Sequence, residues 1–231
     1  MRNPWLDLDL RSSSDSRYVH PADEAVVQAY AAKRRGPEYA LATHLLPEPW
    51  VGRLDAPVVM LLDNPGLSDH ESDPHWTPSD ALRHRAQASL RQKRLDHPYY
   101  WLDDEVSDTE GYGVAVDRLK RVIADVGLEA VGTNLVTLSA HPYHSFSFDD
   151  RLRALPSQRF TVAALRRAIA NDALVVILRA RKYWYTAVPE LEQHDIRGRV
   201  LRSNSPQNVT ITPRNLDDYD ALCRALTAPR R

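Results

Sequence analysis

The sequence predicts an α/β protein with three layers, α/β/α, around a central, mostly parallel sheet of four strands. Three short apolar runs, at residues 56–62, 130–138 and 173–178, predict buried strands. Stretches with apolar residues at helical spacing separate these runs. Because strands that alternate with helices build parallel sheets covered on both faces, this alternation decides the fold class.

The first 55 residues precede the predicted core, which covers residues 56–231. Residues 1–19 predict an irregular arm. Residues 20–35 predict a helix, because apolar side chains recur at helical spacing and Gly36-Pro37 closes it. We find no repeat, low-complexity tract or linker, so residues 1–231 are expected to form a single domain.

The core adds four helices and one short strand to the three apolar runs. Residues 113–126 form the clearest amphipathic helix, with one apolar stripe that ends at Gly127. The other predicted helices cover residues 78–95, 157–171 and 215–226, the first of them rich in basic side chains. A short fourth strand is predicted at 199–202.

Composition bounds the function. The chain has 231 residues, 43% of them hydrophobic, which is enough for one domain with a sizeable core. The net charge of -1 gives no global positive field, so a nucleic-acid partner would need a local basic face. No apolar run approaches the 18 residues of a membrane span, and the amino terminus lacks the apolar core of a signal peptide.

Cys223 is the single cysteine of the sequence. It excludes a disulfide framework, a cysteine-rich zinc site and a four-cysteine iron–sulfur cluster. The simplest interpretation is a cytoplasmic protein in a reducing compartment. We expect no cofactor, no metal and no membrane partner, and a monomer.

Polar clusters accompany three of the predicted strands. They are Asp63-Asn64-Pro65-Gly66, residues 133–138 continued by His141-Pro142-Tyr143-His144, and residues 203–208. Ligands of open α/β sheets bind beyond the carboxyl ends of the strands, so these clusters predict one shared cleft. Taken alone, the first cluster is explained better by an ordinary turn, since Asn-Pro and Pro-Gly pairs are common turn formers.

The order of these motifs resembles the uracil-DNA glycosylase superfamily. The matching stretches are LDNPG at 62–66, NLVTL at 134–138 and SNSPQN at 203–208, within residues 56–215. The resemblance is to the single-strand-selective monofunctional branch and, at the first motif, to the mismatch-specific branch. It implies that family's fold and a DNA glycosylase activity.

The resemblance assigns roles to the first two motifs. Asn64 takes the position that orients the hydrolytic water near the sugar C1′, and Asn134 the position that reads the base edge. A buried asparagine that ties up a strand end is an equal interpretation of Asn134. Some relatives carry a bulky tyrosine near Gly66, so its missing side chain implies room for a 5-substituted pyrimidine.

The third motif departs from the family. The family begins it with a histidine that stabilises the departing base, whereas Ser203 or Asn204 stands there in this chain. His141 and His144 are candidate substitutes, although ordinary surface-loop histidines are the more common explanation. Asp63 is a candidate base or sugar-cation stabiliser, or alternatively a helix cap.

A glycosylase must extrude its target base and stack it on an aromatic ring. Trp76 lies at about the interval where the family places its stacking residue, with Tyr112 and Tyr143 as reserves; core packing is the alternative for Trp76. Basic residues for phosphates, or for an ordinary solvated face, are Arg83, Arg85, Arg91, Lys93, Arg94, Arg179, Arg181 and Lys182. The family's DNA-contacting wedge loop corresponds to the segment with Ser205, Gln207, Asn208, Val209, Ile211 and Arg214.

The leading hypothesis is therefore a monofunctional DNA glycosylase that leaves an abasic site. The altered third motif and the open Gly66 position favour a modified pyrimidine, such as a hypermodified cytosine of phage DNA removed in defence. Lys182 offers an amine for lyase chemistry, but the resemblance places no lysine there. One alternative is a catalytically weak module that binds modified or damaged DNA.

A second alternative is an unrelated α/β hydrolase or nucleotide-binding enzyme. The sequence contains no GxSxG elbow, Walker loop or GxGxxG turn, which argues against it. Placement of Asn64, Asn134 and Ser205 on different edges of the sheet would support this alternative and refute the glycosylase interpretation.

Overall fold

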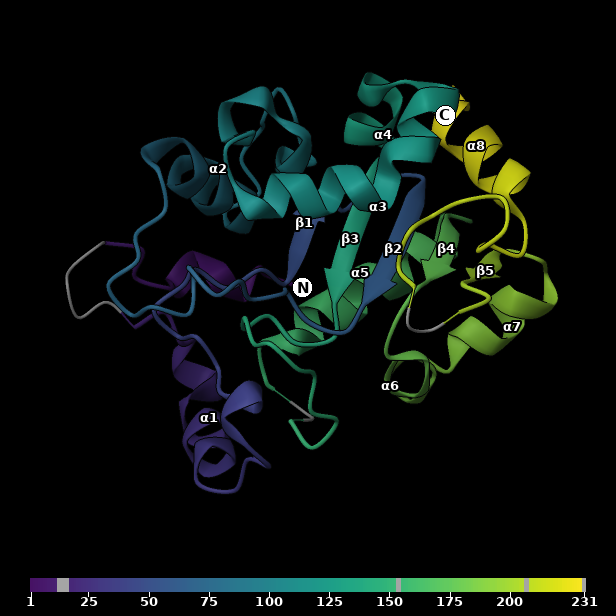
Figure 1. Ribbon diagram of the computed structural model, residues 1–231. Helices are drawn as coiled ribbons and strands as arrows, with labels where there is room; N and C mark the ends of the chain where they lie inside the picture. Colours follow the sequence, from purple (N-terminus) through teal and green to yellow (C-terminus); the bar gives the residue numbers. More distant parts are fainter. Residues whose placement is uncertain (12–16, 153–154, 206–207, 230–231) are drawn as a thin grey trace.

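The computed structural model describes residues 1–11, 17–152, 155–205 and 208–229, which form an α/β protein with a five-stranded, mostly parallel sheet (Figure 1). The strands are β1 (Trp50–Gly52), β2 (Val58–Leu62), β3 (Leu135–Ser139), β4 (Leu174–Ile177) and β5 (Val200–Arg202). Their order across the sheet is β1-β3-β2-β4-β5. The four strands β2 to β5 run parallel, and β1 lies antiparallel to β3 at one edge.

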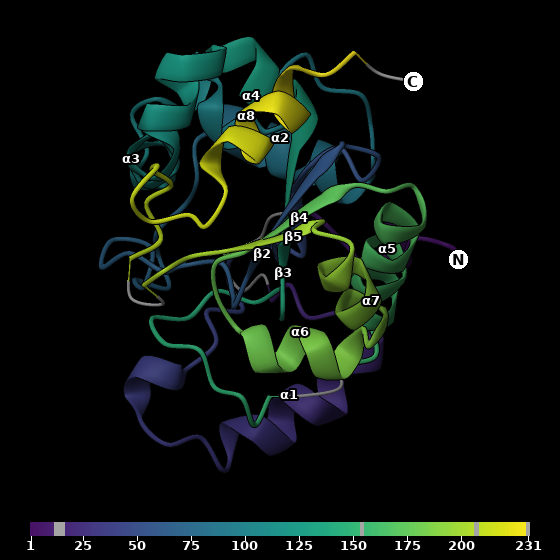
Figure 2. The same cartoon turned by 90° about the vertical axis from the view of Figure 1, so that its right-hand side faces the viewer.

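Helices cover both faces of the sheet, so the layers are α/β/α (Figure 2). The helices of the described residues are α1 (Glu24–Ala31), α2 (Asp80–Leu90), α3 (Glu110–Val126), α4 (Leu128–Asn134), α5 (Gln158–Ala170), α6 (Arg181–Ala187), α7 (Glu190–Ile196) and α8 (Tyr219–Thr227). In Figure 2, α2, α3, α4 and α8 lie above the sheet, while α1, α5, α6 and α7 lie below it.

The central strand β2 is buried on both faces. Val59 and Leu61 point into the core cluster that contains α5, α6 and α7, and Val58 and Met60 point into the cluster that contains α3 and α8. This division follows from the two-residue repeat of a strand. A fully apolar strand is therefore the expected sequence for this central position.

The fifth strand is a difference from the four-stranded sheet that the sequence predicts. Residues 50–52 were expected in the amino-terminal arm, yet Trp50 pairs with Leu138 and Gly52 with Val136. Three residues carry too little periodicity to predict a strand, so only the register with β3 defines β1. The short helices α6 and α7 were also not predicted.

The prediction of a strand over residues 130–138 is wrong in its first half. Gly127 has a φ of +89°, a conformation that glycine adopts without a steric cost, and the chain enters α4 directly after it. The strand β3 begins only at Leu135. A short apolar run is compatible with helix or strand, and here the helix takes the part up to Asn134.

Candidate functional site

A cleft of about 670 Å³ lies at the carboxyl ends of the parallel strands. Its walls come from the segments that follow β2, β3, β4 and β5, together with α3. The chain leaves β2 for β3 on one side and returns to β4 on the other, so this is the point where the strand order reverses. Ligand sites of open α/β sheets occupy this position. We call it the carboxyl-edge cleft.

Asn64 lies in the carboxyl-edge cleft directly beyond β2 and is 9% exposed. Its Nδ2 donates to the carbonyl oxygen of Pro65 (2.8 Å), and to the carbonyl oxygen (2.9 Å) and Oγ (3.0 Å) of Ser145. Two of these partners only accept hydrogen bonds, which fixes the orientation of the amide. Among the described residues no group donates to Oδ1, so this oxygen is left to accept a hydrogen bond from a ligand or water.

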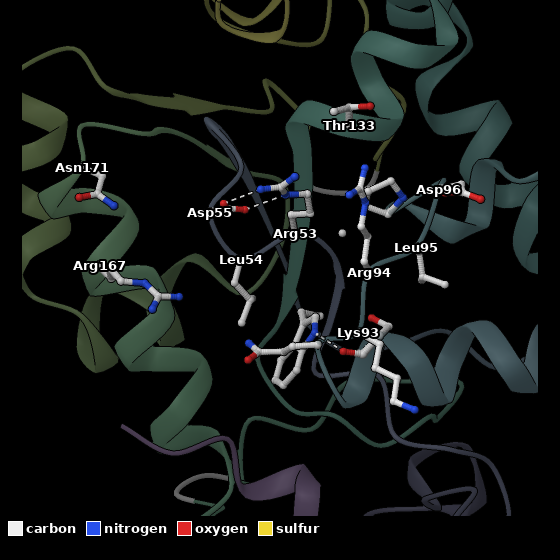
Figure 3. Close-up of a pocket in the computed structure, with 15 residues that line it drawn as sticks. Arg53, Leu54, Asp55, Lys93, Arg94, Leu95, Asp96, Thr133, Arg167 and Asn171 are labelled. Carbon is white, nitrogen blue, oxygen red and sulfur yellow. Dashed lines mark hydrogen bonds and ion pairs between the residues drawn. The ribbon is translucent and has the colours of Figure 1, made fainter. Parts of the chain in front are cut away.

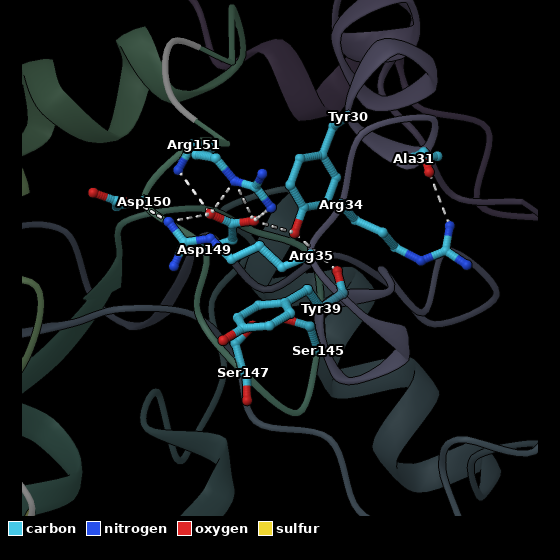
Figure 4. Close-up of polar contacts among 10 residues, drawn as sticks. All are labelled: Tyr30, Ala31, Arg34, Arg35, Tyr39, Ser145, Ser147, Asp149, Asp150 and Arg151. Carbon is cyan, nitrogen blue, oxygen red and sulfur yellow. Dashed lines mark hydrogen bonds and ion pairs between the residues drawn. The ribbon is translucent and has the colours of Figure 1, made fainter.

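The loop after β3 supplies the wall that holds Asn64. Ser145 is 1% exposed, and its Oγ donates to the carbonyl oxygen of Ser147 (3.0 Å). Further along, buried Asp149 accepts hydrogen bonds from Arg151 at 2.8 to 3.1 Å and from the hydroxyl of Tyr30 at 3.3 Å (Figure 4). This loop is therefore anchored by an ion pair at its far end.

The titration behaviour of this anchor agrees with its geometry. The Arg151 guanidinium lowers the pKa of Asp149 to about 2, and burial raises the pKa of Tyr30 to about 12. The single hydroxyl hydrogen of Tyr30 is shared between Asp149 and the carbonyl oxygen of Tyr39, which lies 3.0 Å away, and Tyr39 lines the cleft. The anchor thus keeps its charge at neutral pH and ties the cleft wall to α1.

Four arginines line the carboxyl-edge cleft: Arg118, Arg179, Arg181 and Arg202. Arg202 is committed to an ion pair with Asp195 and a hydrogen bond to the hydroxyl of Tyr185. Arg118 differs, because no described carboxylate lies within ion-pair distance of it; its buried Nε, like that of Arg202, has no partner among the described residues. The positive charge of Arg118 is therefore available to a ligand that carries negative charge.

Aromatic residues also line the carboxyl-edge cleft. Tyr39, Phe146 and Phe148 line it, and Phe146 is 48% exposed. Phe148 stacks on the ring of His141 with centroids 5.3 Å apart and an angle of 12°. An exposed phenylalanine next to a cleft is a surface on which a flat ligand ring can stack.

Other predicted site residues reach this cleft as well. Asp63 and Gly66 line it beside Asn64, and Ser203 lines it from the end of β5. Asp63 Oδ1 accepts a hydrogen bond from the backbone N–H of Asn64 at 3.1 Å. No atom lies within 4 Å of the position of a Cβ on Gly66, so there is open space there. Arg179 lines the cleft from the end of β4.

The side chains of the third motif, residues 203–208, make hydrogen bonds within their own loop where the structure describes them. Ser203 Oγ donates to the carbonyl oxygen of Ser205 at 2.7 Å, and Asn204 Nδ2 donates to that of Arg214 at 3.1 Å. Asn208 Oδ1 accepts from the amide of Thr210 at 2.9 Å. Val209 lines the cleft, whereas Ile211 is 2% exposed in the core. Gln207 lies outside the described residues.

Asn134 does not reach the carboxyl-edge cleft. It ends α4, immediately before β3, and so lies at the opposite edge of the sheet, where Nδ2 donates to the carbonyl oxygen of Leu226 at 2.7 Å. A position at the amino end of a strand is incompatible with contact to a base bound beside Asn64. Asn64 and Ser205 share the carboxyl edge, whereas Asn134 lies at the other edge. The arrangement that counts against the glycosylase interpretation is therefore met for Asn134 and not for Ser205.

The predicted aromatic and histidine contacts also lie elsewhere. Trp76 lines a small hollow beside Tyr100, with His144 in the same hollow. His144 Nδ1 is 2.8 Å from the carbonyl oxygen of Gly66, and Nε2 is 3.1 Å from that of Leu46. His141 is 2% exposed, and burial lowers its pKa to about 4. Neither ring lines the carboxyl-edge cleft.

Tyr112 and Tyr143, the reserve aromatic residues, are also absent from the cleft. Tyr143 is buried and donates to Asp23 at 2.7 Å, and Tyr112 packs against the core on the side of α3. Arg85 is bound to Asp103 at 2.6 Å, and Lys182 lines a separate groove beside α5. The basic residues predicted for phosphates are thus spread over several surfaces.

The sequence offered a signal for Arg118 that our prediction missed. Arg118 follows Ala115 by three residues and precedes Val122 by four, both of which are buried on α3. A basic residue in the apolar stripe of an amphipathic helix indicates a special environment. Phe146 and Ser145 had no comparable signal, because they lie in an irregular loop.

Among the described residues, histidine, cysteine, aspartate and glutamate side chains do not gather in groups of three that could hold a metal ion. In the same part of the chain, no helix has the length and apolar character needed to cross a bilayer. The chain matches no protein-family model, and no curated protein or solved structure is significantly similar to it. The geometry of the site must therefore carry the functional argument.

Proposed function

We propose that the protein is a monofunctional glycosylase that hydrolyses the N-glycosidic bond of a modified pyrimidine in DNA. The observation that carries this proposal is Asn64, whose Nδ2 is bound to three acceptors while Oδ1 has no donor among the described residues. An amide held in this way orients a water molecule without itself being a strong base. Positioning of this kind accounts for much of the rate of such reactions.

In the proposed reaction, Oδ1 of Asn64 accepts a hydrogen bond from the attacking water. The water oxygen bonds to C1′ while the bond from C1′ to the base nitrogen breaks and leaves its electron pair on the base. The proton released by the water ends on the departing base, and the Asp63 carboxylate beside Asn64 stabilises the positive sugar centre.

The departing base carries negative charge, and Arg118 supplies the matching cation. It lines the same cleft as Asn64 and has no described carboxylate as a competitor. Neither Ser203 nor Asn204 fills this role, because both side chains are occupied within their own loop. Phe146 and Tyr39 provide the rings on which the extruded base stacks, in place of Trp76.

The open space at Gly66 supports a substrate with a bulky substituent, such as a hypermodified cytosine of phage DNA. The exclusion of Asn134 from the cleft removes the family's base-reading group, and this favours two other functions in the same cleft. One is a weak or inactive module that binds modified DNA. The other is an enzyme that acts on a free nucleotide.

The deciding experiment measures release of free base by the purified protein. The substrates are DNA with uracil, phage DNA with modified cytosines, and the corresponding free nucleotides. We expect base release from modified DNA, a fall in kcat of at least about 100-fold in Asn64→Ala, and no change in Asn134→Ala. Asn134→Ala is the matched control, because it removes the same side chain from the other edge of the sheet.

Each other outcome identifies an alternative. DNA binding without base release from any substrate would indicate the binding module. Release from free nucleotides but not from DNA would indicate the nucleotide enzyme. Equal activity of wild type and Asn64→Ala would overturn the proposed site.

A further inference from the structure

A second cleft, of about 890 Å³, lies at the opposite edge of the sheet, where the parallel strands begin. Its walls come from the β1–β2 loop, the segment after α2, the end of α4 and the end of α5. Figure 3 shows Arg167 and Asn171 on one wall, Arg94 and Leu95 on the other, and Arg53 between them. We call it the amino-edge cleft.

The amino-edge cleft is positively charged. Four cationic side chains line it, from Arg53, Lys93, Arg94 and Arg167, against the carboxylates of Asp55 and Asp96. Arg53 is paired with Asp55 through two hydrogen bonds of 2.9 and 2.7 Å. Among the described residues no carboxylate lies within ion-pair distance of Lys93, Arg94 or Arg167, which leaves them available for an anion.

The position of these cations is only partly explained by their helices. Basic residues near helix carboxyl termini are common, because they interact favourably with the helix dipole. Arg167 fits this explanation, since it lies in the last turn of α5. Lys93 and Arg94 lie beyond the end of α2, after Gln92 with its left-handed φ of +52°, and line the cleft from the loop.

We propose that the amino-edge cleft binds the phosphate groups of a polyphosphate-bearing ligand, a nucleotide or a polynucleotide. Guanidinium groups bind phosphate oxygens in pairs of hydrogen bonds, and Arg94 and Arg167 present such groups from opposite walls. Hydrogen-bonding side chains of Gln92 and Asn171 line the same space. This inference is independent of the proposed glycosylase, because the two clefts share no lining residue.

The test is calorimetric titration of the full chain at low salt with inorganic tripolyphosphate, ATP and an unmodified oligodeoxynucleotide. We expect tripolyphosphate to bind with a Kd below about 1 mM, and the double variant Arg94→Ala/Arg167→Ala to weaken it by about tenfold or more. All four cationic side chains are exposed, so the double variant keeps its fold, which circular dichroism checks.

Two control variants separate this site from others. Lys33→Ala/Lys120→Ala removes two exposed charges that line neither cleft, and Arg118→Met removes a cation from the carboxyl-edge cleft. Both should bind tripolyphosphate within about twofold of wild type. An equal loss in either control, or no binding to wild type at millimolar concentration, would overturn the proposal.

The three probes then distinguish the source of the phosphates. Equal affinity for tripolyphosphate and ATP would indicate recognition of the phosphate chain alone. Tighter binding of the oligonucleotide, with the same loss in Arg94→Ala/Arg167→Ala, would indicate a polynucleotide. Asn64→Ala should bind all three probes as wild type does, so loss of catalysis and loss of this site are measured separately.

Discussion

The two edges of the sheet carry clefts of similar size but different construction. At the carboxyl edge the polar groups are fixed, because Asn64 makes three hydrogen bonds and Arg202 is held by Asp195. At the amino edge the cations Lys93 and Arg94 project from an exposed loop. Fixed groups favour chemistry, which needs precise positioning, whereas exposed cations are sufficient for binding an anion.

The glycines of the two edges differ in the opposite sense, since the one at the amino edge is crowded and the one at the carboxyl edge is not, and they give the largest expected effect on stability. Gly52 ends β1 with a φ of +104°, and a Cβ there would lie 2.3 Å from the carbonyl oxygen of Leu135. We expect Gly52→Ala to lower the free energy of unfolding by about 3 kcal/mol, through backbone strain and the clash with β3. Urea denaturation measures it.

Gly66→Ala is the matched control at the carboxyl edge. No atom lies within 4 Å of the new Cβ, so the stability should stay within about 0.5 kcal/mol of wild type. If both variants lose the same stability, the open space at Gly66 is structural and the contrast between the edges fails. A selective loss of activity on bulky bases in Gly66→Ala would show that the space serves the substrate.

The next effect concerns catalysis at the carboxyl edge. Arg118→Met keeps an unbranched apolar side chain in place of the aliphatic part of arginine but removes the cation proposed to stabilise the departing base. We expect kcat for base release to fall by about 100-fold, or about 2.7 kcal/mol, with little change in KM. The control Lys120→Met changes a solvent-exposed charge on the same helix.

An Arg118→Met loss that appears mainly in KM would contradict the catalytic role and assign Arg118 to substrate binding. A substrate whose departing base is a better leaving group should be less sensitive to the substitution, because it needs less stabilisation. This dependence on the leaving group separates a direct role from a general distortion of the cleft.

The sequence predicted the edge occupied by Asn64 but not the edge occupied by Asn134. The apolar run before Asn64 has the length of a strand and is too short for a typical helix, and the polar residues follow its carboxyl end as expected. The run around Val131 fits helix or strand equally, and the choice moved Asn134 across the sheet. The wrong prediction of a strand for residues 130–134 is therefore the reason that Asn134 was assigned to the site.

Groups that depend on tertiary contacts were beyond prediction. Ser145 acts through Asn64, 81 residues earlier in the chain, and no local pattern marks it. The strand β1 exists only through its pairing with β3. Lys93 and Arg94 were predicted as phosphate contacts of the basic helix and Arg179 as one that follows a strand, and only the fold shows that they line clefts at opposite edges.

The smallest effect compares buried histidines of the two edges. At the carboxyl edge, His141 has a buried Nδ1 without a partner among the described residues, and burial lowers its pKa to about 4. At the amino edge, His194 Nε2 bonds the carbonyl oxygen of Ala173 at 2.7 Å, and burial lowers its pKa as well. Both rings are therefore neutral in the folded protein at pH 7.

A folded-state pKa below the unfolded value of 6.5 means that the unfolded chain binds more protons between pH 6.5 and 4. The contribution of the neutral, buried histidine to the free energy of unfolding is then fully present above pH 6.5 and is lost as the pH falls toward 4. For His141 the loss at pH 5 is about 2 kcal/mol. We expect His141→Leu to remove about this part of the acid sensitivity, measured by urea denaturation at pH 7.5, 6 and 5.

The matched variant His194→Leu separates the edges, because it removes the amino-edge contribution and leaves that of His141. If the acid sensitivity of His141→Leu equals that of wild type, the ring gains a partner on protonation and the carboxyl edge is not the acid-sensitive one. If it falls as expected, mild acid destabilises the loop that His141 supports through Phe148. Base release should then fall below pH 6 in wild type more steeply than phosphate binding at the amino edge.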